Sequence, residues 1–581
     1  MSSSARMRFG GGAAVSSFQA GVGGAVFAAL AGACAPVAIM ASVAIMAIMS
    51  IMGCSGDRMP RPQRFEAASG AAERPVQPMS AEVRRQLLDG AMQVLGRLDG
   101  YDEAAAFAQV FDRLNQWIHG VTLAGGDQAG GWKLDPLYDT LPAELRSVAL
   151  PESLASSVFD AAEDVPTLRD QRWLADVAAT ARGDAIDDLA VARNLFAWCV
   201  RSLAIVSDPP SVPTEANPGT RWFSTGEVLL AGRASAAQRA WVFLELLRHA
   251  GLDGVMLATG DAATGDLRPW LPALVCDGEA YLFEPLYGLP VPGPGGSGVA
   301  TARQAAADPA ILAALSLPDR PYPVQAGDAA KLSVLVPATP ATLARRMHLL
   351  DGELAGGGRI DLSIAATELG AAALAALPGE AIADRVRLWA FPWETLRRRR
   401  TSAQAVSTAA ARELAPLVVA FEQSTPGGAR RSVRPLYAAR LREFRGELDG
   451  PDGAKAAYML ARPAATVIAE AAGRAPPQQA DGVRRLYEGM KEDATYWLGV
   501  LMLAEGEHEA AVDYLGRMIL ELAPDSRWAD AARRNLAVAE AALGHTAKAI
   551  ELLRADPSPQ RFGSRLEAAR LERASSAAAP R

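Results

Sequence analysis

Cysteine is scarce in this chain of 581 residues. The cysteines lie far apart, with no CxxC pair and no cysteine and histidine cluster at metal-ligand spacing, which argues against a zinc site or a dense disulfide scaffold. An excess of positive charge is also missing, since 58 basic and 65 acidic side chains give a net charge of -7. We therefore expect no metal, no cofactor and no nucleic-acid partner. The four cysteines are Cys34, Cys54, Cys199 and Cys276.

The length excludes a single hydrophobic core, because domains commonly hold about 100 to 200 residues and this chain is several times longer. Half of the residues are hydrophobic and 21% are charged, which is ordinary for globular proteins and argues against wholesale disorder. We expect three or four folded units.

Charge is absent from the whole stretch between Arg8 and Asp57, and residues 21–52 are mostly apolar. The sequence that ends this stretch, Ile51-Met52-Gly53-Cys54, resembles a bacterial lipobox, in which the cysteine accepts the lipid. The resemblance implies an exported protein anchored to a membrane of the bacterial cell envelope, on the periplasmic side.

Two features depart from the lipobox pattern: Met52 is bulkier than usual, and the apolar stretch is long for a signal peptide. An uncleaved transmembrane helix remains the alternative for residues 1–54, because 18 or more apolar residues can cross a bilayer. Cys34 follows a small residue but lacks the aliphatic one, so it is the weaker acceptor. Residues 55–80, rich in proline, arginine and glutamate, are expected to form a flexible linker.

Apolar residues recur at helical spacing through residues 81–190, which predicts a helical region. Further on, residues 331–336 and 359–364 alternate as half-buried strands do, on either side of a predicted helix, and indicate a small α/β and helical region over residues 325–450. The arginine run at 397–400 is interpreted as a solvated helix end.

The segment from Gly232 to Asp253 is the most informative part of the chain. Its ending, Leu-Leu-Arg-His-Ala-Gly-Leu at residues 246–252, resembles the end of the nucleophile helix in the transglutaminase-like, papain-related superfamily. Strand-like segments follow, with Asp277-Gly278 predicted as a hairpin turn. The resemblance covers residues 191–290 and implies an α+β domain.

The catalytic residues of that family are missing from the matching positions. The place of the cysteine falls on Ala236, and the place of the histidine falls on Pro269 or Trp270, whereas Glu284 stands where the aspartate would be. Amide or ester attack by this route needs a nucleophile and a base. The sequence thus indicates a transglutaminase-like fold that has lost its catalytic residues.

An enzymatic alternative stays open, in which Ser235 acts as a substitute nucleophile together with Glu284 on peptides or cell-wall material. Cys276 is a second, displaced candidate nucleophile. Cys199 and Cys276 are expected to be two separate thiols, although export would permit their pairing.

A repeat of 38 residues occupies the C-terminal part, residues 454–560, before a tail at 561–581. It resembles a lengthened tetratricopeptide repeat, which implies an α-solenoid that binds a protein or peptide partner. The expected fold class is therefore α+β, with a helical N-terminal region, a transglutaminase-like domain and a C-terminal solenoid. The matching pairs are Gly506 and Gly544, Ala511 and Ala549, Leu515 and Leu553, and Leu498 and Leu536.

Overall fold

The computed structural model describes residues 79–123, 131–207, 222–261, 266–354, 360–424 and 430–578. The predicted anchor, with Cys34 and Cys54, and most of the predicted linker lie outside these residues. Within the described part of the chain, no helix combines the length and the apolar character that crossing a membrane requires.

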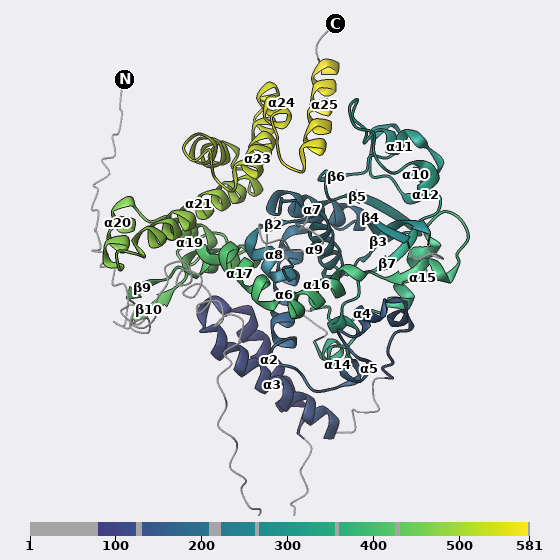
Figure 1. Ribbon diagram of the computed structural model, residues 1–581, viewed down its shortest axis with the longest axis horizontal. Helices are drawn as coiled ribbons and strands as arrows, with labels where there is room; N and C mark the ends of the chain where they lie inside the picture. Colours follow the sequence, from purple (N-terminus) through teal and green to yellow (C-terminus); the bar gives the residue numbers. More distant parts are fainter. Residues whose placement is uncertain are drawn as a thin grey trace, which may run out of the picture.

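A mixed sheet of six strands lies at the centre of the molecule (Figure 1). Its strand order is β6-β5-β4-β3-β7-β8, and all neighbours are antiparallel except β7 and β8. Together with the many helices around it, this sheet confirms the predicted α+β class. The strands are β3 (Asp253–Asp261), β4 (Asp266–Cys276), β5 (Glu279–Glu284), β6 (Leu289–Pro290), β7 (Ser333–Val336) and β8 (Val386–Leu388).

The predicted hairpin turn joins β4 to β5. Asp277 and Gly278 both have positive φ angles, 52° and 73°, as a two-residue type I′ turn requires. Asp277 is the one residue other than glycine with a positive φ in the described part of the chain. The turn prediction is confirmed, and it fixes the register that places Leu274 opposite Tyr281.

The prediction of a strand at residues 359–364 is wrong. Residues 360–364 belong to no strand, because their peptide groups bond to other partners. The N–H of Leu362 donates to the Asp351 carboxylate, and the N–H of Ile364 donates to the carbonyl of Thr342. The segment is apolar because it is buried, with Ile360 1% exposed, and not because it pairs in a sheet.

Helix α9 (Ala236–His249) packs on β3 and β4, and α7 (Asp188–Ser202) packs on α9 and β4. Phe196, Phe243 and Phe283 meet between these elements, with ring centroids 4.9 to 5.2 Å apart. On β8, Gly370 of α15 (Ala366–Ala375) lets the helix approach closely, since a Cβ there would lie 2.3 Å from Val386.

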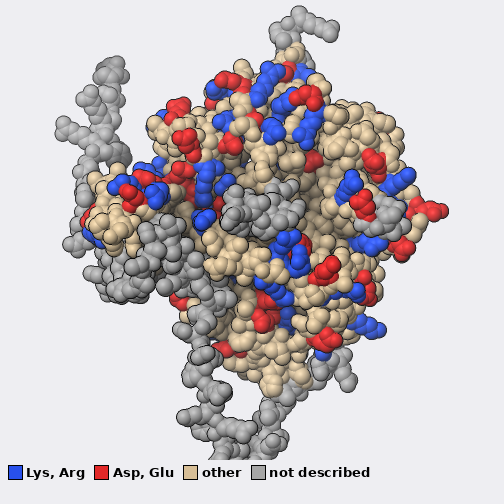
Figure 2. All heavy atoms as spheres, viewed as in Figure 1, with Lys and Arg blue, Asp and Glu red and all other residues tan. Residues whose placement is uncertain are grey.

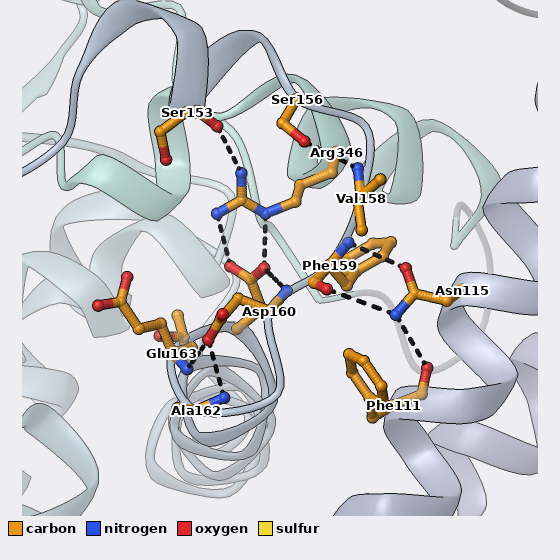
Figure 3. Close-up of polar contacts among 12 residues, drawn as sticks. Phe111, Asn115, Ser153, Ser156, Val158, Phe159, Asp160, Ala162, Glu163 and Arg346 are labelled. Carbon is orange, nitrogen blue, oxygen red and sulfur yellow. Dashed lines mark hydrogen bonds and ion pairs between the residues drawn. The ribbon is translucent and has the colours of Figure 1, made fainter. Parts of the chain in front are cut away.

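The N-terminal hairpin of α2 (Ala81–Gly96) and α3 (Glu103–Leu123) packs on α6 (Asp164–Ala181), as Figure 1 shows. Arg346 of α14 (Arg345–Glu353) fixes the start of α6, because its guanidinium pairs with both oxygens of Asp164 at 2.6 and 2.8 Å. It also donates to the carbonyl of Ser153 at 3.0 Å (Figure 3).

Helix α16 (Ala390–Thr401) carries the arginine run, and the prediction of a solvated helix end is wrong. Arg397 and Arg398 pair with Glu394 of the same helix. Arg399 pairs with Glu227, and Arg400 pairs with Glu163, so the run ties α16 to two other parts of the chain.

The C-terminal helices form hairpins in which both residues of each predicted repeat pair have similar surroundings. Gly506 and Gly544 end their helices with φ angles of 80° and 82°, a conformation that favours glycine. The other three pairs are all buried. The helices are α21 (Ala480–Ala504), α22 (His508–Val512), the π-helix η7 (Asp513–Glu521), α23 (Ala529–Ala542), α24 (Thr546–Arg554) and α25 (Arg561–Ala578).

These helices are packed against the rest of the protein. The ring of Trp497 in α21 lies 3.5 Å from the guanidinium of Arg440, and it lies so close to Gly232 that a Cβ there would be 2.1 Å away. Trp497 also meets Trp528, which stacks on Tyr496 at 4.2 Å. The C-terminal helices and the central unit therefore share a core.

Shorter elements complete the fold. The helices are η1 (Leu98–Gly100), η3 (Pro136–Thr140), α4 (Ala143–Arg146), α5 (Pro151–Ala155), α8 (Thr225–Ala231), η4 (Pro294–Gly296), α10 (Ala302–Ala307), α11 (Pro309–Ala313), α12 (Ala326–Ala329), α13 (Pro340–Leu343), η5 (Ala383–Arg385), α17 (Ala403–Leu414), η6 (Ala415–Val418), α18 (Pro435–Phe444), α19 (Ala454–Leu460) and α20 (Ala465–Arg474). The strands are β1 (Ala204–Ile205), β2 (Arg233–Ala234), β9 (Phe421–Ser424) and β10 (Arg430–Val433).

Candidate functional site

The start of α9 is the position where the family resemblance places the nucleophile. Ala236 is the first residue of the helix and Ser235 is its N-cap. The Ser235 hydroxyl accepts the N–H of Gln238 at 3.3 Å, and the Gln238 side chain accepts the N–H of Ser235 at 3.0 Å. In this reciprocal capping box, each of the two side chains satisfies the backbone N–H of the other residue at the helix start. The Ser235 oxygen is thus engaged in helix capping and is 1% exposed.

Two positions that the resemblance assigns to catalysis, Trp270 for the base and Glu284 for the acid, are linked by hydrogen bonds through Tyr322. The Trp270 indole N–H donates to the Tyr322 hydroxyl at 3.0 Å, and this hydroxyl donates to the Glu284 carboxylate at 2.5 Å. The other oxygen of Glu284 accepts the N–H of Leu286 at 2.9 Å. The family resemblance leaves Pro269 and Trp270 as alternatives for the histidine position. Of the two, Trp270 is linked to Glu284 by hydrogen bonds through Tyr322.

The protonation of this chain of hydrogen bonds follows from its burial. Burial raises the pKa of Glu284, against the opposing effect of the Tyr322 hydroxyl and the backbone N–H groups. Burial and the neighbouring Glu284 carboxylate hold the pKa of Tyr322 well above its ordinary value. Tyr322 therefore keeps its proton at neutral pH and acts as a donor. The Glu284 carboxyl is occupied by a tyrosine where the family would place an imidazole.

A histidine near α9 does exist, but it lies at the opposite end of the helix from Ala236. A helix of this length, Ala236–His249, separates its ends by roughly 20 Å. The Nε2 atom of His249 lies 2.7 Å from the Gln171 side-chain oxygen, and its Nδ1 atom accepts the N–H of Asp361 at 3.3 Å. Burial and the adjacent Arg248 hold the pKa of His249 well below its ordinary value. It serves to join α9 to α6 and to the segment at residues 360–364.

The two cysteines of the described residues are separate thiols, Cys199 in α7 and Cys276 at the end of β4. Burial raises the pKa of Cys199 to about 12 and that of Cys276 to about 11. Because the thiolate is the reactive form, neither thiol is activated at neutral pH. In the described ranges there is also no group of three or more side chains of the kinds that hold a metal ion.

A buried charged residue that sequence reasoning missed lies one turn into α9. Arg239 is completely buried and donates to the carbonyl of Pro285 at 2.9 Å, to the side-chain oxygen of Gln560 at 2.8 Å and to the carbonyl of Leu203. All three acceptors are neutral. The signal was present in the sequence, since Arg239 interrupts the apolar face of a helix whose neighbours Ala240, Val242 and Phe243 are buried.

The surface offers no patch of a single charge as a clearer candidate on the face that Figure 2 shows, where acidic and basic side chains are interspersed over the described residues. Comparisons of the chain with protein-family models, with curated proteins and with solved structures found no match. The site is therefore defined by its own geometry: a capped helix start, a buried Trp270–Tyr322–Glu284 chain and an unpaired buried arginine beside them.

Proposed function

We propose that this chain is a binding or scaffold protein of the bacterial cell envelope, tethered to a membrane through Cys54, whose transglutaminase-like unit is catalytically inactive. The observation that carries the proposal is what stands in the catalytic positions. Ala236 has no nucleophile, Trp270 has no basic nitrogen, and the Glu284 carboxylate is occupied by Tyr322. Covalent acyl transfer needs a nucleophile and a base in hydrogen-bond contact.

The partner in this proposal is a protein or peptide that binds the tetratricopeptide-like helices. One face of α23 is already engaged within the chain, because Asn535 donates to the carbonyl of Arg201 and to the Tyr496 hydroxyl. The partner must therefore use a surface that remains open. Leu522, which follows η7 and is 69% exposed, marks such a surface.

Turnover tests the inactive-enzyme part of the proposal. We expect the full chain in detergent to release no product from amide peptides or cell-wall material beyond the background of the Ser235→Gly and Glu284→Gln variants. Glycine is a tolerable N-cap, so Ser235→Gly removes the hydroxyl at a cost of only a few tenths of a kcal/mol. Turnover that is present in the unmodified chain and lost in Ser235→Gly contradicts the proposal and favours a serine-dependent hydrolase or transferase.

Capture from envelope extract tests the partner. The full chain and two variants are compared, Leu522→Asp on the proposed surface and Ile186→Asp as a matched control, since Ile186 is 91% exposed on the loop between α6 and α7. We expect a protein partner that is lost with Leu522→Asp and retained with Ile186→Asp. Equal capture by all three chains contradicts the assignment of the surface.

A further inference from the structure

A cavity of about 240 Å³ lies between the central unit and the C-terminal helices. Its walls come from the end of α7, from β1 and β2, from α9, from α23 and from the link between α24 and α25. Five arginines and a single acidic residue, Asp530, line it. The arginines are Arg201, Arg233, Arg239, Arg527 and Arg534.

Three of these arginines have carboxylate partners outside the cavity. Arg233 pairs with Glu413 at 3.1 Å, and Arg534 pairs with Glu567 at 3.3 Å. Arg527 pairs with Asp493. The lining carboxylate is engaged as well, because Asp530 pairs with Arg533 at 3.1 Å. The positive charge of these three arginines is therefore compensated within the protein.

Arg201 and Arg239 differ from these three: among the described residues, no carboxylate forms an ion pair with either, although the Glu443 carboxylate, which pairs with Arg440, acts on Arg201 from a distance. Arg239 is 0% exposed and bonds only to neutral oxygens. Isolated charges are expensive to bury and are normally paired or bound to a ligand. The lining of the cavity thus carries two guanidinium groups that lie in no ion pair.

Donor groups at the cavity also lack acceptors. The Nε atoms of Arg201 and Arg239 and the Nε2 atom of Gln560 are buried without a hydrogen-bond partner. Gln560 is 3% exposed, and its oxygen already accepts from Arg239, so its free amide hydrogens have no acceptor among the described residues. A buried donor without an acceptor costs about 1 to 3 kcal/mol, so an acceptor that reached these donors would stabilise the folded chain.

We propose that this cavity binds the phosphate group of a small phosphate monoester or inorganic phosphate. A phosphate monoester carries a charge of about -1.5 to -2 near neutral pH, which suits a lining with two guanidinium groups that lie in no ion pair. Its oxygens match the planar fork of arginine donors. At about 30 Å³ per water molecule, the volume corresponds to about eight waters, which suits a small head group and excludes a polymer.

This inference does not rest on the proposed scaffold function, because it uses none of the catalytic positions and none of the partner surface around Leu522. A protein that turned over peptides through Ser235 would still carry the same five arginines at this cavity. The two proposals therefore fail or succeed in separate experiments.

The test is binding to the full chain in detergent, with inorganic phosphate and methyl phosphate as probes and acetate as the carboxylate control, all at constant ionic strength. The readout is the midpoint of thermal unfolding, which a ligand specific for the folded state raises in a saturable way. We expect both phosphate probes to give a saturable rise and acetate to give none. A larger rise with methyl phosphate than with inorganic phosphate assigns the ester as the preferred source.

Two variants and one control locate the site. Arg201→Gln removes a charge that lies in no ion pair, and Gln560→Glu adds a negative charge beside Arg239, which now donates to the Gln560 amide oxygen at 2.8 Å. We expect each to weaken phosphate binding at least tenfold. Arg193→Gln on the same helix, at an exposed position that does not line the cavity, should bind as the unmodified chain does.

Three results would overturn the assignment. The first is the lack of a saturable rise with either phosphate probe in the unmodified chain. The second is an equal rise in Arg201→Gln, Gln560→Glu and Arg193→Gln, because it places any binding elsewhere. The third is a rise with acetate as large as that with phosphate, because it assigns the cavity to carboxylates.

Discussion

Two regions of the molecule each bury an arginine, but only one of them places carboxylates next to the guanidinium. Arg169 on α6 pairs with Glu103 at 3.1 Å and with Asp170 at 2.8 Å, whereas Arg239 on α9 meets only neutral oxygens. Burial lowers the pKa of both, but the two carboxylates more than offset it at Arg169 and raise its pKa. At Arg239, burial and the nearby Arg534 lower the pKa to about 9.

The charge of Arg169 is compensated by carboxylates of the chain, whereas the charge of Arg239 has no carboxylate in hydrogen-bond contact. The carboxylates around Arg169 come from α3 and α6, so that ion cluster joins two helices of the N-terminal region. Arg239 joins α9 to the C-terminal link through hydrogen bonds alone. Glu284 is the acidic counterpart, since it is buried and receives only neutral donors. Arg239 follows Ser235 and Ala236 in the first turn of α9, and Glu284 is the residue at the acidic position of the resemblance.

The largest effect is expected for Arg169→Met. Removing this guanidinium leaves Asp170 buried without its cation and Glu103 with only the more distant Arg434, and breaking a buried ion pair from one side costs about 3 to 5 kcal/mol. The measurement is the free energy of unfolding in guanidinium chloride. The control is Arg172→Met on the same helix, whose more exposed pair with Asp176 is expected to contribute under about 1 kcal/mol. An equal loss of unfolding free energy in the two variants would contradict the expected difference between the buried ion pairs of Arg169 and the more exposed pair of Arg172.

A smaller effect is expected for Arg239→Met, although Arg239 is the more deeply buried of the two arginines. The variant leaves neutral acceptors unsatisfied, which costs about 1 to 3 kcal/mol, and it relieves an uncompensated charge. A loss larger than that of Arg169→Met would show that the charge of Arg239 is balanced within the chain.

The pH dependence of the same variant sharpens the comparison. The pKa of Arg239 is about 9 in the folded chain, below the ordinary 12.5, so above pH 9 the unfolded chain binds more protons and stability rises with pH. Burial raises the pKa of the neighbouring Cys199 and Tyr496, so these two groups keep their protons up to about pH 10. We expect the unmodified chain to gain stability relative to Arg239→Met between about pH 8 and about pH 10.

The smallest effect is expected for Tyr322→Phe, which removes the hydroxyl that donates to Glu284 and costs about 1 to 2 kcal/mol. The pKa of Glu284 is raised, so its contribution to stability is fully present below 4.5 and is lost as the pH rises through the folded-state value. Loss of the Tyr322 donor raises that pKa further, so the destabilisation should grow as the pH rises above 4.5 and through the two folded-state values. Tyr101→Phe, at a tyrosine that is 45% exposed, is the control and should show no such trend.

Local signals in the sequence predicted several elements correctly. The Asp277-Gly278 pair predicted a tight hairpin because a type I′ turn requires two positive φ angles, and the structure has both. The apolar spacing of residues 81–190 predicted helices, and this region is largely helical where the structure describes it. In each case the residues that determine the conformation are neighbours in the chain.

Predictions failed where the deciding partner lies far away in sequence. Residues 360–364 alternate like a strand, but Asp351 and Thr342 take their peptide hydrogens. The acidic position Glu284 was found from the resemblance, whereas its partner Tyr322 lies 38 residues further on and carries no local signal. The cavity could not be predicted from the sequence for the same reason, since its arginines come from separate stretches of the chain.

The hydrogen bond between Arg239 and Gln560 spans 321 residues of the chain. At a synthesis rate of about 5 to 20 residues per second, roughly 16 to 64 seconds pass between the appearance of Arg239 and that of Gln560. During this interval the α9 guanidinium has no Gln560 amide to which it can donate. The order of synthesis therefore means that this contact of the central unit cannot form before the C-terminal helices have been made.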